Sequence, residues 1–336
     1  MLQRSLALLL VLLASWTAPG HRPQAEGLRA YLPYPPAERE ALVRRFLAAK
    51  SSAHLLLGPQ AARAVAELLR LELRNQAEGK RSAFQTPKEA LEAAEAWLSA
   101  LGQARRREAV DLRGLPTAPW HVLSHQEEVR KAAHALRIPV GVLAAIVDNE
   151  QHGGDKALGL SRGVREVADE AALALAQSGP APFSRTLGLA QMSWEDALRQ
   201  RPRLERFGAW DPARPFPETE KEARAALEDP YLNLLFTASR LRGLFNALYG
   251  LDPADTRPLE DPWLYYLGPA WHNYPFRAQN LETWEDSFHG LFKGLLYQVL
   301  LEDEVLWRAQ GQLLRPVRRY GPGLLEARGK TPGLEP

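Results

Sequence analysis

One glutamate, Glu150, combines a chemically useful side chain with an unusual position. It follows Val142 and Ile146 at four-residue steps, so in a helix its carboxylate lies on the same face as an apolar stripe. At the predicted C-terminal end of that helix, desolvation and the helix dipole both raise the pKa of the carboxyl group. A carboxyl group that is still protonated near neutral pH can protonate a leaving oxygen, as glycosidic cleavage requires. The alternative is a solvated glutamate at a frayed helix end.

Three further segments follow this glutamate and give it a context. The run that contains it reads ALRIPVGVLAAIVDNEQ over residues 135–151, and GLAQM follows at 188–192. A long apolar helix is predicted at 231–249, and DPWLYYLGPAW follows at 261–271. In this order the four segments resemble the catalytic region of lytic transglycosylases of the lysozyme superfamily. The resemblance covers roughly residues 120–275.

The resemblance implies an all-α protein with a lysozyme-like catalytic domain that cleaves peptidoglycan glycan strands between N-acetylmuramic acid and N-acetylglucosamine. Glu150 corresponds to the general acid and base of that family. It protonates the leaving oxygen and then accepts the proton of the sugar's own 6-hydroxyl as a 1,6-anhydro ring closes, so one carboxyl group suffices. The substrate-binding residues that the resemblance implies are Gly188, Leu189, Gln191, Met192, Tyr265, Tyr266 and Asn273.

The chemistry of these residue types suits a glycan groove. Glycine at position 188 permits a close approach of the backbone. The amide of Gln191 can both donate hydrogen bonds to sugar amides and hydroxyls and accept hydrogen bonds from them. Tyr265 corresponds to the family tyrosine that hydrogen-bonds near the catalytic carboxylate, and Gly268 and Pro269 complete its motif.

The chain departs from the family pattern at three places. Gln151 stands where a serine usually follows the glutamate. Tyr266 replaces the asparagine of the motif, and Asn273 is close enough in sequence to substitute for it. The stretch between the glutamate and GLAQM is longer than usual, which implies an inserted element around residues 163–182. These departures indicate a divergent branch in which the acid is retained.

Two other functions fit the same residues. A hydrolytic muramidase or chitinase-like enzyme needs a second carboxylate to activate water. Asp148 points to another face of the helix than Glu150 because it lies two residues away. A catalytically inactive glycan-binding or scaffolding protein of the cell wall is favoured by Gln151 and Tyr266, whereas the retained acid counts against it. The candidates for the second carboxylate are Asp148, Asp155, Glu166 and Asp169.

No cofactor is expected. His121 and His125 have a spacing that metal ligands use, but no H-E-x-x-H pattern is present. A helix is predicted to begin at Ser124, so the two histidines do not lie in one continuous helix. The sequence also lacks a P-loop, a dinucleotide fingerprint and a G-x-S-x-G elbow. Aromatic residues that could stack on sugar rings or pack in the core are Trp263, Tyr265, Tyr266, Trp271, Tyr274 and Phe276.

The N-terminus indicates export to the periplasm or cell envelope. Arg4 precedes a short apolar stretch at 6–16, followed by Pro, Gly and small residues, which is typical of a signal peptide over residues 1–25. An uncleaved signal would instead act as a membrane anchor. Of the 42 basic residues only Arg4 and Arg22 lie in this segment, so its removal leaves 40 basic and 40 acidic residues. A neutral mature protein gives no reason to expect nucleic acid as a partner. The chain has no cysteine, which excludes disulfides.

Caps and periodicity divide the rest of the chain. Residues 26–118 form a helical N-terminal region whose role is open: an adaptor, a regulator, a contact for other cell-wall proteins, or packing against the groove. Residues 119–320 form the lysozyme-like domain, and residues 321–336 a disordered tail. The expected helices span 37–50, 59–78, 86–102, 124–137, 139–150 (broken by Gly153 and Gly154), 164–177, one capped by Ser193 and Asp196, 229–250, and a last one containing 284–299.

Overall fold

The computed structural model describes residues 43, 44, 48, 57–158, 186–273, 283–303, 307–309 and 312–314. These are mainly helical, with 66% helix and 3% strand, which confirms the expected all-α class. The segments expected to be a signal peptide, a disordered tail and an inserted element lie outside the described residues, as does most of the helix expected at 37–50. No described helix is long and apolar enough to span a membrane.

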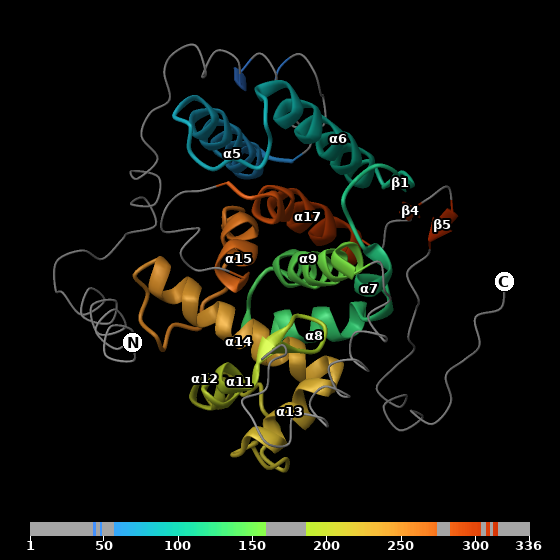
Figure 1. Cartoon of the computed structure of the whole chain (residues 1–336). Helices are drawn as coiled ribbons and strands as arrows, with labels where there is room; N and C mark the ends of the chain where they lie inside the picture. The colour runs from blue at the N-terminus through green and yellow to red at the C-terminus, as the bar shows by residue number, and fades with distance from the viewer. Residues whose placement is uncertain are drawn as a thin grey trace.

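Two N-terminal helices, α5 (Pro59–Ala77) and α6 (Pro87–Arg105), form one layer of the molecule (Figure 1). Thr86 caps α6 as predicted, with its hydroxyl accepting from the backbone N–H of Glu89 at 3.2 Å. The helix continues three residues beyond Gly102, where the sequence predicted its end. Both helices pack on α17 (Glu285–Glu302), and Trp97 of α6 donates a hydrogen bond to His289 of α17 at 2.9 Å.

The helix expected to begin at Ser124 is divided in two, and the prediction that Ser124 caps it is wrong. Ser124 ends the short α7 (Pro119–Ser124), and α8 (Gln126–Leu136) begins after His125. The Ser124 hydroxyl donates to the carbonyl of Trp120 at 2.8 Å, and His125 occupies the N-cap position of α8. Arg137 ends α8 in the left-handed conformation, with φ 55°, near the predicted boundary before Pro139.

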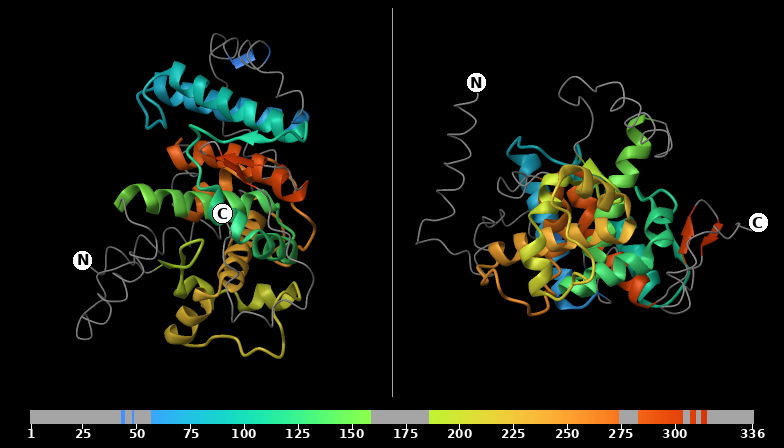
Figure 2. Two further views of the ribbon diagram at one scale, coloured as in Figure 1. Left: turned by 90° about the vertical axis from the view of Figure 1, so that its right-hand side faces the viewer. Right: turned by 90° about the horizontal axis from the view of Figure 1, so that it is seen from below.

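The helix that carries Glu150 is longer than predicted. α9 spans Val140–Leu158 and passes through Gly153 and Gly154 without a break, so the prediction of an end there is wrong. Glycine costs a helix interior only about 1 kcal/mol relative to alanine, which does not by itself end a helix. In both views of Figure 2 the last turns of α9 extend beyond the neighbouring helices.

A hairpin and four helices form the lower part of Figure 1. Strand β2 (Thr186–Leu187) pairs antiparallel with β3 (Met192–Ser193), so GLAQM forms the turn. The Ser193 hydroxyl accepts from the N–H of Asp196 at 3.1 Å, and Asp229 caps the long helix as predicted. The helices are α11 (Trp194–Leu198), α12 (Arg201–Arg206), α13 (Glu220–Glu228) and α14 (Pro230–Leu248).

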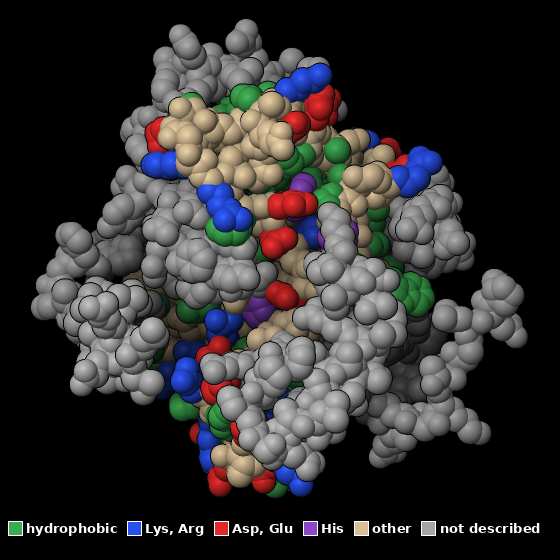
Figure 3. All heavy atoms as spheres, in the orientation of Figure 1, with side chains coloured by type: hydrophobic (Ala, Val, Ile, Leu, Met, Phe, Trp, Pro, Cys, Tyr) green, Lys and Arg blue, Asp and Glu red, His purple; other side chains and the backbone are tan. Residues whose placement is uncertain are grey.

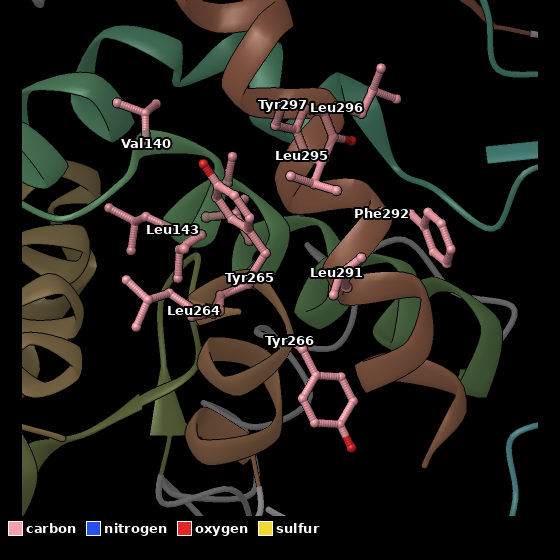
Figure 4. Close-up of a cluster of buried hydrophobic side chains, with 14 of the residues drawn as sticks. Val140, Leu143, Leu264, Tyr265, Tyr266, Leu291, Phe292, Leu295, Leu296 and Tyr297 are labelled. Carbon is pink, nitrogen blue, oxygen red and sulfur yellow. The ribbon is translucent and has the colours of Figure 1, made fainter. Parts of the chain in front are cut away.

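Three helices meet in the core: α9, α15 (Leu264–Asn273) and α17. Glycines allow the close approach. A Cβ on Gly141 of α9 would overlap the carbonyl oxygen of Gly294 in α17, and a Cβ on Gly294 would lie 2.6 Å from the ring of Tyr265. Figure 4 shows side chains from these helices in one apolar cluster, and the buried residues of α5 and α6 belong to the same core.

Three short strands complete the described part of the chain. β1 (Val110–Asp111) pairs in parallel with β4 (Trp307–Ala309), and β4 pairs antiparallel with β5 (Gln312–Leu314). The strands that follow α17 in the chain thus form a sheet with β1, which follows α6.

Candidate functional site

Glu150 lies where α9 leaves the core. Every residue from Gly141 to Asn149 is buried, whereas the Glu150 side chain is 19% exposed. The helix continues for eight residues beyond Glu150, so the carboxylate does not stand at the negative end of the helix dipole, whose effect is confined to the last turn. Of the two reasons for a raised pKa that the sequence suggested, partial burial remains and the dipole does not.

The side chain of His272, from α15, lies against this acid. Its Nε2 atom lies 3.9 Å from Glu150 Oε1. The same Nε2 lies 2.5 Å from the carbonyl oxygen of Ala190. A carbonyl can only accept, so Nε2 carries the hydrogen. On the other side of the ring, Arg240 Nη1 lies 3.4 Å from Nδ1 and donates to the His272 carbonyl at 3.1 Å.

The His272 ring is therefore neutral. Burial and the neighbouring Arg240 guanidinium lower its pKa to about 3, against the opposing effect of the Ala190 carbonyl. Arg240 is itself paired with Asp196 of α11, at 3.3 Å between Nε and Oδ2. Because the imidazole carries no charge near neutral pH, it does not stabilise the ionised form of Glu150 as a cation at this distance would.

The turn Gly188–Met192 is held beside the acid by side chains from three helices. Gln151 of α9, which is 3% exposed, donates its amide to the carbonyl of Leu189 at 2.8 Å. His272 of α15 donates to the carbonyl of Ala190. Asn233 of α14 accepts from the N–H of Ala190 at 3.0 Å and donates to the carbonyl of Leu187 at 2.7 Å. These bonds fix the turn relative to the helix that carries Glu150.

Gly188 is required in this turn by both conformation and space. Its φ of 76° is in the left-handed region, and a Cβ there would overlap the side-chain amide of Asn233 and lie 2.6 Å from the carbonyl oxygen of Leu227. Gln191 also has a positive φ, 49°. Its amide donates to the carbonyl of Gly188 at 2.9 Å and accepts from the Thr186 hydroxyl at 3.2 Å. Gln191 thus shapes the turn, and its predicted contact with substrate stays a prediction.

The other predicted groove residues are placed as follows. The side chains of Leu189 and Met192 are buried. Tyr265 is buried against Gly294 at the level of Gly141, nine residues or about 13 Å along α9 from the acid, and Figure 4 shows its hydroxyl turned toward Val140. The structure therefore does not bring Tyr265 together with Glu150.

Tyr266 and Asn273 complete the predicted set. The Tyr266 ring is buried and stacks on Trp263, with 5.0 Å between ring centroids, so it contributes to packing. The backbone of Asn273 ends α15, but its side chain lies outside the description, as do those of Trp271, Tyr274 and Phe276.

Asp148 has no access to the surface of the site. It is fully buried, with Oδ1 2.6 Å from the ammonium of Lys293 in α17. Its other oxygen accepts from the Thr117 hydroxyl at 2.5 Å, from the N–H of Ala118 at 2.9 Å and from the Tyr297 hydroxyl. These contacts agree with the predicted orientation away from Glu150. The side chains of Asp155, Glu166 and Asp169 lie outside the description.

The described residues contain no group of three or more acidic or histidine side chains that could hold a metal ion. His121 lies within α7 and His125 between α7 and α8, so they do not share a continuous helix. Figure 3 shows acidic and histidine side chains following one another down the middle of the face seen in Figure 1. The site is thus a partly exposed acid beside a neutral histidine and a rigid turn.

No protein-family model, curated protein or solved structure matches this chain.

Proposed function

We propose that this chain is an exported peptidoglycan lytic transglycosylase with a lysozyme-like domain, in which Glu150 is the general acid and base. The observation that carries the proposal is the arrangement around Glu150: a partly exposed carboxyl group, an uncharged imidazole 3.9 Å away, and the Gly188–Met192 turn, which is bonded to that imidazole and to the neighbouring Gln151. An acid must be protonated to begin glycosidic cleavage, and partial burial next to an uncharged neighbour favours the protonated form.

The proposed reaction needs one carboxyl group. Glu150 gives its proton to the leaving glycosidic oxygen, and the resulting carboxylate accepts the proton of the sugar's 6-hydroxyl as that oxygen attacks the anomeric carbon. A new C–O bond replaces the broken one, and the product is a 1,6-anhydro sugar without the addition of water. Asp148 cannot serve as a second catalytic carboxylate because its oxygens are engaged by Lys293 and by three hydrogen-bond donors.

The rigid turn supplies the second element of the proposal. A glycan lying along the Gly188–Met192 backbone would meet the acid at a constant distance, because Gln151 and His272 bind consecutive carbonyls of the turn. Positioning of this kind contributes as much to catalysis as the acid itself. Gln151 stands where the related enzymes usually have serine, and its bond to Leu189 is the function we assign to the departure.

The test is mass spectrometry of purified peptidoglycan after digestion by the protein produced without residues 1–25. Glu150→Gln is compared with Glu92→Gln. Glu92 is an exposed glutamate of α6, so this variant controls for the effects of a Glu→Gln substitution and of purification. We expect 1,6-anhydromuramyl products from the wild type and from Glu92→Gln, and a loss of at least about a thousandfold in Glu150→Gln, since the acid acts in both proton transfers.

Other products would redirect the assignment. Reducing-end sugars that depend on Glu150 would indicate the hydrolase alternative, with its second carboxylate among Asp155, Glu166 and Asp169. Binding to the glycan without any cleavage would indicate the scaffolding protein.

A further inference from the structure

The ring of His272 lies among groups from four parts of the fold. It belongs to the last turn of α15 and is 3% exposed in its side chain. The charged groups that the description places around it are Glu150 of α9 and Arg240 of α14, with Asp196 of α11 against Arg240. The hairpin contributes the Ala190 carbonyl. Each nitrogen of the ring thus has a defined neighbour.

A histidine this close to a catalytic acid has two opposite effects, depending on its charge. An imidazolium 3.9 Å from the carboxylate would favour the ionised form of Glu150 and lower its pKa by about 1–3 units. A neutral imidazole has no such effect and still offers one N–H donor. The surroundings select the neutral ring, because a proton on Nδ1 would face the guanidinium of Arg240.

We infer that His272 is the positioning residue of this site: its neutral ring holds the Ala190 carbonyl of the turn beside Glu150, and Arg240 fixes the tautomer in which Nε2 carries the hydrogen. The inference rests on the proposed function of Glu150 as the acid. It adds Arg240 and Asp196 to the site as the groups that keep this histidine uncharged. None of the three touches the reacting atoms, so their effect on the reaction passes through Glu150 and the turn.

The first experiment is nuclear magnetic resonance of the His272 ring nitrogens in the full protein. In the wild type we expect the Nε2–H tautomer and no protonation between pH 8 and pH 5. In Arg240→Met we expect the ring to titrate closer to the ordinary value for histidine, about 6.5. Titration of His272 between pH 5 and pH 7 in the wild type, or a ring protonated on Nδ1 alone, would overturn the inference.

The second experiment compares peptidoglycan cleavage by His272→Gln and His272→Phe, with circular dichroism to confirm folding. Glutamine keeps an N–H donor for Ala190, so we expect kcat within about threefold of the wild type; phenylalanine removes the donor and lowers kcat at least tenfold. In Arg240→Met the loss of activity at the alkaline side begins at a lower pH than in the wild type, since a charged ring lowers the pKa of Glu150. Equal kcat values for His272→Phe and the wild type would contradict the inference.

A matched control and an activity-independent measurement separate this inference from the proposed function. His134 of α8 is 61% exposed and lies 3.2 Å from Glu302, so His134→Phe removes a histidine beside a glutamate elsewhere and leaves activity unchanged. If neither the wild type nor any variant cleaves peptidoglycan, the proposed function fails. The pH titration of the carbon-13 signal of the Glu150 carboxyl group then tests the inference without an activity measurement. A titration of that signal that is identical in the wild type and in Arg240→Met, where the ring is expected to carry a charge, overturns the role given to Arg240 and His272.

Discussion

Asp148 and Glu150 lie two residues apart on α9 and have opposite surroundings. Asp148 faces α17, where it is fully buried and paired with Lys293 at 2.6 Å. Glu150 faces α15 and the hairpin, where it is 19% exposed and has a neutral histidine as its neighbour. A carboxyl group is therefore buried against a lysine at one position and partly exposed beside a neutral histidine at the other.

The difference shows that one helix can place two carboxyl groups in different environments. Positions two apart point to different faces, so one carboxylate can hold the core together while the other borders a surface. Asp148 is paired with a lysine and accepts from three donors, so both of its oxygens are engaged inside the protein. Glu150 instead lies 3.9 Å from the neutral imidazole of His272. The following predictions test this contrast, from the largest expected effect to the smallest.

Lys293→Met should have the largest effect, because it leaves the Asp148 carboxylate buried without its cation. Removing one partner of a buried ion pair costs about 3–5 kcal/mol of unfolding free energy. Urea denaturation at pH 7 measures it, with Lys88→Met as the control. Lys88 forms an exposed pair with Glu92 at 3.7 Å, and its loss should cost less than about 0.5 kcal/mol. A change below 1 kcal/mol in Lys293→Met would mean that Asp148 does not need its partner.

Gly188→Ala should destabilise the turn beside Glu150 by about 2–4 kcal/mol, as the sum of a left-handed backbone and an overlap with Asn233. Gly208→Ala is the matched control, because Gly208 has a φ of 60° and open space around its Cβ position. It should show the backbone cost alone, about 1–2 kcal/mol. Urea denaturation of both variants gives the difference. Equal losses would show that Asn233 can move aside.

The free energy of unfolding should decrease as the pH is lowered, and protonation of His272 should account for part of this decrease. The folded-state pKa of His272 is about 3, whereas in the unfolded chain it is about 6.5. Between these values the unfolded chain binds the additional proton, so the stabilisation is complete above pH 6.5 and decreases as the pH falls toward 3. Between pH 7 and pH 5 this group should account for a loss of about 2 kcal/mol.

The comparison with His272→Gln isolates this contribution. Glutamine does not titrate, so the variant should lose about 2 kcal/mol less than the wild type between pH 7 and pH 5. Urea midpoints at both pH values measure the difference. Parallel slopes for the two proteins would contradict a neutral, buried His272.

Gln151→Ser should have the smallest effect. It installs the serine that usually follows the catalytic glutamate in lytic transglycosylases, the activity proposed above, and removes the 2.8 Å hydrogen bond to the Leu189 carbonyl. The loss of one hydrogen bond costs about 0.5–1.5 kcal/mol. Thermal unfolding against Gln85→Ser, an exposed glutamine, measures it. An unchanged Tm would show that the turn is held well enough by Asn233 and His272.

Much of the secondary structure could be predicted from local patterns. The Thr86 cap, the Ser193 cap and the start of α14 at Asp229 and Pro230 depend on a few adjacent residues, and such signals are readable in sequence. Predictions failed where packing outweighs a local preference. Gly153 and Gly154 remain helical in α9, and Ser124 ends α7 instead of capping α8.

The candidate site was predictable in part. Glu150 and the Gly188–Met192 turn stand out because of residue type and spacing, and their proximity is supported by the bonds that Gln151 and His272 make to the turn. His272, Arg240 and Asn233 were missed. They lie in helices where a polar residue gives no signal of its partner, and each partner is more than thirty residues away in sequence.

The sequence by itself determined the helical class, the caps at Thr86, Ser193 and Asp229, and the stripe that places Glu150 on an apolar face, because these depend on neighbours within one or two turns of helix. Only the tertiary structure decided which carboxylate of α9 is buried with a lysine and which meets a neutral histidine. That choice depends on how α15, α17 and the hairpin pack around α9. Burial and the charge of distant residues set the protonation of a group, and neither is encoded in the residues beside it.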